Sequence, residues 1–361
     1  MFGSPNLVLC FLFPNQFVIN SHPIAKSLIH WYSGAKRELP WRKTREPYVI
    51  WISEIILQQT RVDQGLPYFE RFIESFPSVH KLASASEDDV LANWQGLGYY
   101  SRARNLHTTA KYVSEKLNGH FPKTYAELLR LKGIGPYTAA AISSICFDRP
   151  EPVVDGNVFR VASRIFGVAD DISKSSTRKV FTDILKKIIP HGQPGEFNQA
   201  IMEHGATVCK PRPACGECTL SQFCHAFKEN RATDFPVKGK KTTVRNRNLF
   251  YLVLERDGRV LMKKRKGQDI WQGLYDFPQA ESGEIKVGNH APLVTDPIIH
   301  LLSHQKLHVR FLRFPDLAQQ EFDKLARSYT CEAFSFKQIV ALPKPKVIVD
   351  FVQKTFGTKD N

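Results

Sequence analysis

The chain lacks any apolar run long enough to cross a bilayer. Its most apolar early segment, residues 7–18, is interrupted by Pro14, Asn15 and Gln16, and no lysine or arginine precedes it. A spanning helix needs about 20 apolar residues, and a secretory signal begins with basic residues. We therefore expect neither membrane insertion nor export, and we interpret residues 1–22 as an N-terminal extension that is appended or disordered.

Acidic residues are scarce relative to basic ones. The 361 residues include 35 aspartates and glutamates against 50 lysines and arginines, a net charge of +15. Such an excess favours a polyanionic partner, nucleic acid in particular, over a small substrate or a membrane surface. The length suggests two domains, each with its own core.

Cysteines are also few, seven in all, and three of them (Cys10, Cys146 and Cys331) are scattered. The other four follow the pattern C-x5-C-x2-C-x5-C: Cys209, Cys215, Cys218 and Cys224. With no histidine in register, these sulfurs suit either a 4Fe-4S cluster or a structural zinc ion. Two disulfides are the weaker alternative, because no secretory signal precedes the chain. A reducing compartment follows.

The order of patterns along the chain predicts two domains joined by a linker. Periodic apolar residues predict helices with short loops over residues 23–225. Residues 226–248 are basic, with only two acids, and predict a linker. Short β-prone runs separated by turn signals, Asp257-Gly258 among them, then predict an α+β domain over 249–361; the runs are 250–254, 260–264, 298–302 and 309–314.

Two local patterns in the helical half point to chemistry. Residues 48–62 predict a largely buried helix with the Glu54 carboxyl inside, which is a costly placement. Gly133 and Gly135 form a turn before a helix that should begin at Pro136. Glycines allow close backbone approach, and the free N–H groups of that helix could hold a phosphate beside Lys132. A tight connection explains this turn equally well.

Further along, Asp155 follows two valines, and either it or Gly156 should cap a new helix. The order of the glycine turn, Asp155, residues 197–200 and the four cysteines resembles the endonuclease III superfamily of DNA glycosylases, whose motifs cover residues 23–225. That resemblance implies a helix-hairpin-helix domain with a 4Fe-4S cluster. The first cysteine gap is one residue shorter than is usual in that superfamily, which leaves the DNA contacts of this loop, and to a small degree its metal, open.

Three further motifs lie at residues 39–42, 51–60 and 94–102. They resemble those of the MutY family of adenine DNA glycosylases, which remove adenine mispaired with 8-oxoguanine. This resemblance implies that Glu54 is the catalytic acid and Asp155 the stabilising carboxylate. Tyr137 stands where relatives with strong lyase activity carry a Schiff-base lysine. A monofunctional glycosylase is therefore expected, with Tyr137 and Asn157 positioning the sugar and the attacking water.

The same resemblance implies the residues that hold the flipped base. Gln59 and Tyr99 match the wedge positions, which keep open the gap left in the duplex. Trp41, Arg42 and Gln199 match the adenine pocket. An aromatic residue such as Trp41 is more often part of a core than of a pocket.

The chemistry of the reaction supports the assignment of the two carboxyls. Adenine leaves readily only once its ring is protonated, so the reaction needs a carboxylic acid kept neutral near pH 7, and apolar neighbours favour that state for Glu54. An ionised Asp155 could then stabilise the oxocarbenium-like sugar or trap it covalently. The alternative for Glu54 is a buried ion pair with Arg42.

The C-terminal half resembles a MutT-like (Nudix) recognition domain, most clearly at residues 271–278. No R-E-x-x-E-E helix of metal-binding carboxylates follows Gly273, so we expect binding without hydrolysis. Residues 300–304 resemble the loop that senses 8-oxoguanine, with Leu302 in place of the family's phenylalanine. Ser303 and His304 would read the damaged base, unless the segment is an ordinary β-turn.

The predicted protein therefore combines α and α+β domains, a helix-hairpin-helix glycosylase with a 4Fe-4S loop followed by a Nudix-like domain. We expect a monomer in the cytoplasm, or at the nucleoid of a bacterium, acting on duplex DNA that contains 8-oxoguanine:A or G:A. One alternative is a glycosylase or AP lyase for another base. Another is a non-catalytic iron-sulfur protein that binds DNA or senses redox state, although such a protein would need neither Glu54 nor Asp155. A nucleotide hydrolase is the least favoured.

Overall fold

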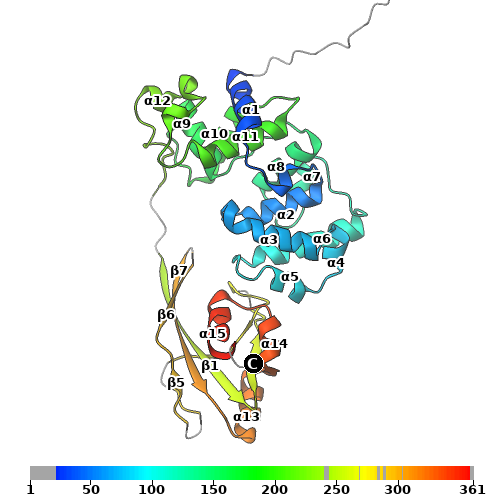
Figure 1. The fold of residues 1–361 in the computed structure, drawn as a ribbon, viewed down its shortest axis with the longest axis vertical. Helices are drawn as coiled ribbons and strands as arrows, with labels where there is room; N and C mark the ends of the chain where they lie inside the picture. Colours follow the sequence, from blue (N-terminus) through cyan, green and yellow to red (C-terminus); the bar gives the residue numbers. More distant parts are fainter. Residues whose placement is uncertain are drawn as a thin grey trace, which may run out of the picture. The chain divides into compact units, whose positions relative to one another are not determined.

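The computed structural model describes residues 22–239, 244–267, 269–282, 285–287, 290–302 and 304–357 (Figure 1). The predicted N-terminal extension up to residue 21, and Ser303, lie outside the described residues. The chain divides into two compact units: residues up to 37 with 148–237, and residues 38–147 with those from 238 onward. No described helix is long and apolar enough to span a membrane.

The first unit is helical. Its helices are α1 (Pro23–Ala35), α9 (Gly156–Phe166), α10 (Ser175–Lys186), α11 (Pro194–Thr207) and α12 (His225–Lys228). Helix α11 packs against both α1 and α9. The four cysteines follow α11 in a loop, residues 209–224, that contains the short 3-10 turns η2 (Cys215–Glu217) and η3 (Ser221–Phe223). We call this segment the cysteine loop.

The helical part of the second unit begins with the 3-10 turn η1 (Pro40–Arg42). It continues with α2 (Pro47–Leu57), α3 (Val62–Ser75), α4 (Val79–Ser84), α5 (Glu87–Asn93), α6 (Ser101–Lys116), α7 (Tyr125–Leu128) and α8 (Pro136–Phe147). Helix α2 packs against α3 and α8 and is buried along most of its length. Prolines begin α2 and α8, where the missing N–H would have no helical partner in any case. The predicted start at Pro136 is confirmed.

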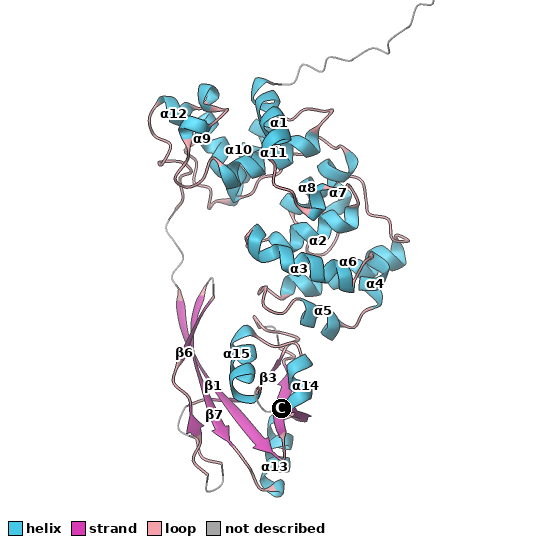
Figure 2. Cartoon of the chain, in the orientation of Figure 1, coloured by secondary structure: helices cyan, strands magenta, loops and turns pink. Residues whose placement is uncertain are grey.

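Every described strand lies beyond residue 244 (Figure 2), which confirms the predicted α+β half. The strands are β1 (Arg245–Arg256), β2 (Arg259–Lys264), β3 (Tyr275–Asp276), β4 (Gln279–Ala280), β5 (Leu293–Val294), β6 (Ile298–Leu301), β7 (Gln305–Phe314) and β8 (Glu332–Ser335). β1 runs parallel to β7, with Tyr251 opposite Phe311, and the other pairs are antiparallel. β1 and β2 are joined at Asp257 and Gly258, which both have positive φ, as a tight hairpin requires.

Helices cover both faces of this sheet: α13 (Gln319–Tyr329), α14 (Phe336–Ala341) and α15 (Lys346–Phe356). Leu252 and Leu254 of β1 belong to a core with Phe322 of α13. On the opposite face Phe311 stacks on Phe351 of α15, with ring centroids 3.8 Å apart. Because side chains alternate along a strand, β1 and β7 contribute to both cores.

Within the second unit the α+β part contacts the helical part at several points. Lys264 forms an ion pair with Asp88 at 2.6 Å, and the Tyr100 hydroxyl donates to the Lys344 carbonyl at 3.2 Å. Lys344 is only 1% exposed, and its ammonium donates to carbonyls at the end of α14. Burial lowers the pKa of Lys344 to about 8. The residues that resemble a Nudix domain are thereby joined to the turn that contains Tyr99.

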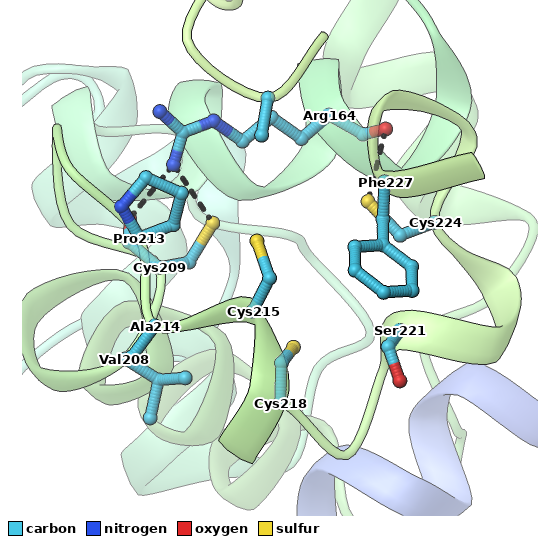
Figure 3. Close-up of a pocket in the computed structure, with 11 residues that line it drawn as sticks. Arg164, Val208, Cys209, Pro213, Ala214, Cys215, Cys218, Ser221, Cys224 and Phe227 are labelled. Atoms are coloured by element: carbon cyan, nitrogen blue, oxygen red, sulfur yellow. Dashed lines mark hydrogen bonds between the residues drawn. The ribbon is translucent and has the colours of Figure 1, made fainter. Parts of the chain in front are cut away.

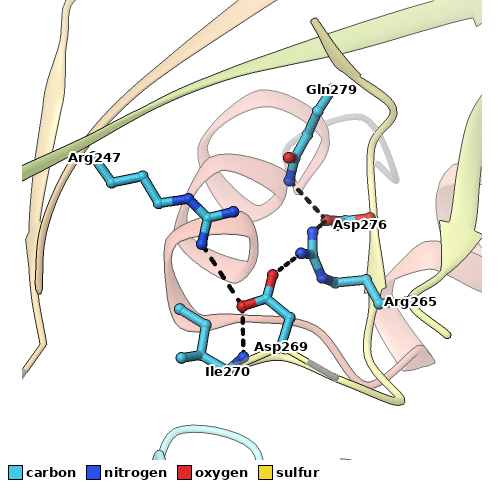
Figure 4. A network of polar contacts seen from close by, with 6 residues as sticks. All are labelled: Arg247, Arg265, Asp269, Ile270, Asp276 and Gln279. Carbon is cyan, nitrogen blue, oxygen red and sulfur yellow. Dashed lines mark hydrogen bonds and ion pairs between the residues drawn. The ribbon is translucent and has the colours of Figure 1, made fainter. Parts of the chain in front are cut away.

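A polar network holds the segment that resembles a Nudix domain, residues 271–278 (Figure 4). Arg265, at the end of β2, pairs with Asp276 of β3 at 2.5 Å and with Asp269, which also pairs with Arg247 of β1 at 3.6 Å. Asp276 is fully buried, and its burial raises the pKa to about 6 in spite of Arg265. The network therefore joins β1, β2 and β3 around residues 269–276.

Candidate functional site

Glu54 lies inside α2, as predicted, with 8% of its surface exposed. Its helical neighbours Ile52, Ile55 and Ile56 are buried. Removal from water disfavours the charged form of a carboxyl, so a buried position suits an acid that must keep its proton. The structure thus confirms the predicted buried placement, while the role of Glu54 stays a prediction.

The segment that follows α2 bears the first predicted wedge residue. Gln59 is exposed and has a φ of 58°, a left-handed conformation that is uncommon for a residue with a side chain. Gln58 donates to the Thr138 hydroxyl at 3.3 Å, which links this turn to α8 beside the half-buried Tyr137. Tyr99, the second predicted wedge residue, is 43% exposed and also left-handed, with a φ of 49°.

Arg102 ties these two turns together and was not foreseen from the sequence. It donates to carbonyls at the end of α2 through Nη1 (Ile55, 2.7 Å; Ile56, 3.1 Å; Gln58, 2.7 Å) and to carbonyls of the Tyr99 turn through Nη2 (Leu97, 3.4 Å; Gly98, 3.3 Å). Burial lowers the pKa of Arg102 to about 10. The helix that carries Glu54 and the turn that carries Tyr99 are therefore held by one side chain.

In the glycine turn before α8, Gly133 adopts a left-handed conformation and Gly135 does not. Lys132, Gly133 and Gly135 are exposed, and Gly133 has a φ of 80°. A Cβ atom at Gly133 would lie 2.7 Å from the Cβ atom of Asn105, whereas one at Gly135 would meet nothing within 4 Å. The requirement for glycine at residue 133 is therefore structural, and phosphate binding at this turn stays a prediction.

Gly133→Ala should lower the free energy of unfolding by about 1–3 kcal/mol, because a left-handed alanine is strained and its methyl group meets Asn105. Gly135→Ala is the matched control, since its methyl group has room, and it should leave stability nearly unchanged. Chemical denaturation measures both. Equal stabilities of the two variants would contradict the prediction, and a weaker duplex affinity in Gly135→Ala alone would locate a phosphate here.

Asp155 caps α9, which confirms one of the two predicted caps. Its Oδ1 accepts the Val158 N–H at 2.7 Å, and its Oδ2 accepts from Asn157 Nδ2 at 3.0 Å. Burial raises the pKa of Asp155, and these two hydrogen bonds act in the opposite direction. Asn198 belongs to the predicted motif at residues 197–200. Its side-chain oxygen accepts the Val153 N–H at 3.1 Å and so holds the segment just before Asp155.

A chain of hydrogen bonds leads from Asp155 to the cysteine loop. Asn157 Oδ1 accepts from Arg160 Nη2 at 2.8 Å, and Arg160 Nε donates to the Cys209 carbonyl at 2.6 Å. Gly205 of α11 lies so close to Asn157 that a Cβ atom there would be 2.7 Å from the asparagine Cβ. Asn157, predicted to position sugar and water, therefore also connects α9 with the loop.

The four predicted ligands come together around one cavity (Figure 3). Arg164 of α9, 2% exposed, lies against the cavity and donates to Cys209 Sγ at 3.2 Å and to the Lys210 carbonyl at 2.7 Å. Burial raises the pKa of the Cys218 thiol to about 11. The Arg164 guanidinium is positively charged and buried beside the cysteine sulfurs. This site therefore suits a negatively charged group that is bound by thiolates.

His204 of α11 also reaches the cysteine loop and was not foreseen. It is 1% exposed, its Nε2 lies 3.4 Å from Cys218 Sγ, and the Trp31 ring meets it edge-on with centroids 5.0 Å apart. Burial lowers the pKa of His204 to about 4. In sequence this histidine lies outside the cysteine spacing, so no motif indicated the contact.

The residues predicted for the adenine pocket have varied surroundings. Trp41 in η1 is buried and packs edge-on against Phe69, with centroids 4.9 Å apart, which is a core contact. Arg42 beside it is half-buried. Gln199 of α11 accepts the Tyr32 hydroxyl at 3.1 Å. Base binding by these residues stays a prediction.

A cavity of about 460 Å³ in the second unit brings Tyr99 together with His304. Trp271, His300 and Lys346 line it as well. The Trp271 and His300 rings have centroids 6.3 Å apart, and burial lowers the pKa of His300. Two predicted DNA-contacting residues from distant parts of the sequence thus share one pocket.

The chain is similar to known families and proteins. Residues 52–187 match the family described as HhH-GPD superfamily base excision DNA repair protein, and residues 249–354 match the NUDIX domain. The adenine DNA glycosylase of Buchnera aphidicola subsp. Acyrthosiphon pisum is 32% identical over 345 residues, covering 91% of this chain and 97% of that protein. The Homo sapiens adenine DNA glycosylase is 43% identical over 211 residues, covering 55% of this chain and 38% of that protein.

Among solved structures, a thermostable thymine-DNA glycosylase is similar to this chain with a TM-score of 0.52 and 27% identity. The match covers 57% of this chain and 95% of that one.

Proposed function

Because this chain belongs to the adenine DNA glycosylase family of base excision repair proteins, we propose that it removes adenine mispaired with 8-oxoguanine, or with guanine, from duplex DNA. The observation that carries the proposal is the Glu54 carboxyl, 8% exposed within an apolar helix whose end Arg102 joins to the Tyr99 turn. Gln59 and Tyr99, which lie on the two turns that Arg102 joins, are exposed and can enter a duplex. The net charge of +15 suits this partner.

The proposed reaction starts with the adenine rotated out of the helix, at a cost of a few kcal/mol. Gln59 and Tyr99 occupy the gap. Glu54 donates its proton to the adenine ring, the bond from the sugar to the base breaks, and the bonding electron pair leaves with adenine. Asp155 in its ionised form stabilises the cationic sugar. Water held by Tyr137 and Asn157 then adds to the sugar and gives its surplus proton to the Glu54 carboxylate, which leaves an abasic site and restores the acid.

We propose a 4Fe-4S cluster in the cysteine loop. Four sulfurs line one cavity, whereas in the described part of the chain no three ligating side chains are placed to hold a single metal ion. Four thiol ligands suit either group, and membership of the chain in a family of base excision repair glycosylases favours the 4Fe-4S cluster over zinc. The cluster would supply a rigid cross-link, with Lys210 and Arg212 held near the DNA backbone.

For the Nudix-like domain we propose recognition of 8-oxoguanine without hydrolysis. The cavity that contains Tyr99, Trp271 and His304 supports this role, because it combines aromatic surface with polar groups as damaged-base recognition requires. We expect Ser303 to contribute to this recognition, and the enzyme to act as a monomer in the cytoplasm.

Single-turnover release of adenine from duplexes that differ only in the opposing base tests the proposal. We expect rapid release opposite 8-oxoguanine, slower release opposite guanine and little opposite thymine. Rapid release of thymine from a G:T duplex would instead support a relative of the thymine-DNA glycosylase that the helical part resembles. No release from any duplex by protein with its full iron content would contradict an enzymatic function.

A further inference from the structure

His204 holds an imidazole nitrogen against one of the four cysteine sulfurs. Its Nε2 lies 3.4 Å from Cys218 Sγ, within hydrogen-bonding reach of a sulfur. The residue is fixed at both its backbone and its ring: the His204 carbonyl accepts the N–H groups of Val208 at 3.0 Å and Cys209 at 2.8 Å, and Trp31 packs against the ring. The contact is therefore built into the junction between α11 and the cysteine loop.

The direction of this hydrogen bond follows from the chemistry of the sulfur. A cysteine that binds iron is a thiolate, which carries no proton and can only accept. The proton between the two atoms must then belong to Nε2. The other ring nitrogen, Nδ1, is buried and has no hydrogen-bond partner among the described residues. The opposite tautomer would leave an unsatisfied N–H at the buried Nδ1 and would turn the Nε2 lone pair toward the thiolate, so it would lose the hydrogen bond to sulfur as well.

We propose that His204 donates its Nε2–H to the Cys218 sulfur and thereby raises the reduction potential of the cluster. This inference rests on the proposed 4Fe-4S cluster. Reduction adds one electron to the cluster, and a hydrogen-bond donor at a ligand sulfur stabilises the more negative state. No bond forms or breaks at His204 in that step. The side chain therefore acts as a positioning and tuning residue, not as a catalytic one.

Arg164 also donates to a ligand sulfur, but it is a poorer probe. Its guanidinium binds the carbonyls of Lys210, Pro211 and Phe235 as well as Cys209 Sγ, so its replacement would disturb the backbone of the loop. At His204 the hydrogen bond can be removed while the ring remains. His204→Phe keeps a planar ring against Trp31 and lacks the N–H, and His204→Gln is the matched control, because its amide N–H extends close to the position of Nε2.

The test measures the one-electron reduction potential of the cluster in the holoenzyme by protein-film voltammetry, after its iron and sulfide contents have been determined. At a fixed potential we expect the ratio of oxidised to reduced cluster to rise about tenfold in His204→Phe, which corresponds to a fall of about 59 mV in the potential. His204→Gln should stay near the unmodified protein. Equal potentials in the unmodified protein and His204→Phe, with the cluster intact in both, would overturn the inference.

A second measurement needs no variant. The histidine-selective ¹⁵N NMR spectrum of the unmodified holoenzyme shows which ring nitrogen of His204 carries the proton. A proton on Nε2 supports the inference, and a proton on Nδ1 overturns it even if His204→Phe fails to assemble its cluster. Protein that contains zinc or no iron would show at the first step that the proposed cofactor is wrong, and this inference would fall with it. An intact 4Fe-4S cluster whose reduction potential is unchanged in His204→Phe would instead overturn this inference alone.

Discussion

Replacement of Glu54 by glutamine should lower the single-turnover rate of adenine release by about a hundredfold to ten-thousandfold, the usual contribution of a general acid. Glutamine has nearly the same volume and can form hydrogen bonds, but it has no acidic proton to give to the base. Because Glu54 is 8% exposed among apolar neighbours, the substitution changes the protonation chemistry far more than the packing of α2. Duplex affinity should therefore remain close to that of the unmodified enzyme.

The neighbouring residue provides a matched control. Ser53 is fully buried on the same helix, and its hydroxyl donates to the Ile50 carbonyl at 2.8 Å within that helix. Ser53→Ala perturbs the packing of α2 without touching an acid, so adenine release should persist. If Glu54 were a structural ion-pair partner instead, Glu54→Gln would lower the free energy of unfolding by about 3–5 kcal/mol. A retained rate combined with such a loss of stability would contradict the assignment.

Features that depend on local sequence were predicted well. Pro136 begins α8, Asp155 caps α9, and Asp257 with Gly258 turns the hairpin between β1 and β2, because each depends on the conformational preference of one or two residues. The buried position of Glu54 was predicted from the apolar run around it. These residues could be placed without knowing what they contact elsewhere in the chain.

Features that depend on contacts between distant segments were not predicted. Arg102 and Arg164 look like ordinary surface charges in sequence, yet each donates to several backbone carbonyls, Arg102 from a half-buried position and Arg164 from a buried one. His204 approaches Cys218 only because α11 ends where the cysteine loop begins. The parallel pairing of β1 with β7 was equally hidden, since a short apolar run shows that a strand forms but not which strand lies beside it.

The Asp155 carboxylate has two roles in the proposed mechanism, and substitutions can separate them. Asp155→Asn removes the negative charge while its amide oxygen can still cap α9, because asparagine is as good an N-cap as aspartate. We expect adenine release to fall by about a hundredfold to a thousandfold, the typical loss when one preorganised electrostatic contact to a transition state is removed. Single-turnover kinetics measure this directly.

The stability of Asp155→Asn should change by less than about 1 kcal/mol. The bond from Asn157 Nδ2 is lost, but burial already disfavours the ionised carboxylate, so a neutral side chain offsets that loss. Asp155→Ala is the comparison variant, because it removes the charge and the cap together. It should lose a similar factor in rate and about 1 kcal/mol more in stability. If Asp155 served only as a cap, Asp155→Asn would retain the full rate.

The pH dependence of the rate provides an independent test of the same carboxylate. Asp155 must be ionised to stabilise the cationic sugar, so the rate should fall as the pH decreases through its pKa. Burial raises that pKa, which places the fall at a higher pH than an ordinary aspartate would give. Asp155→Asn has no group to protonate there, and its smaller rate should lack this acid limb. An acid limb that persists unchanged in the variant would assign the titration to another group and remove the ionised Asp155 from the mechanism.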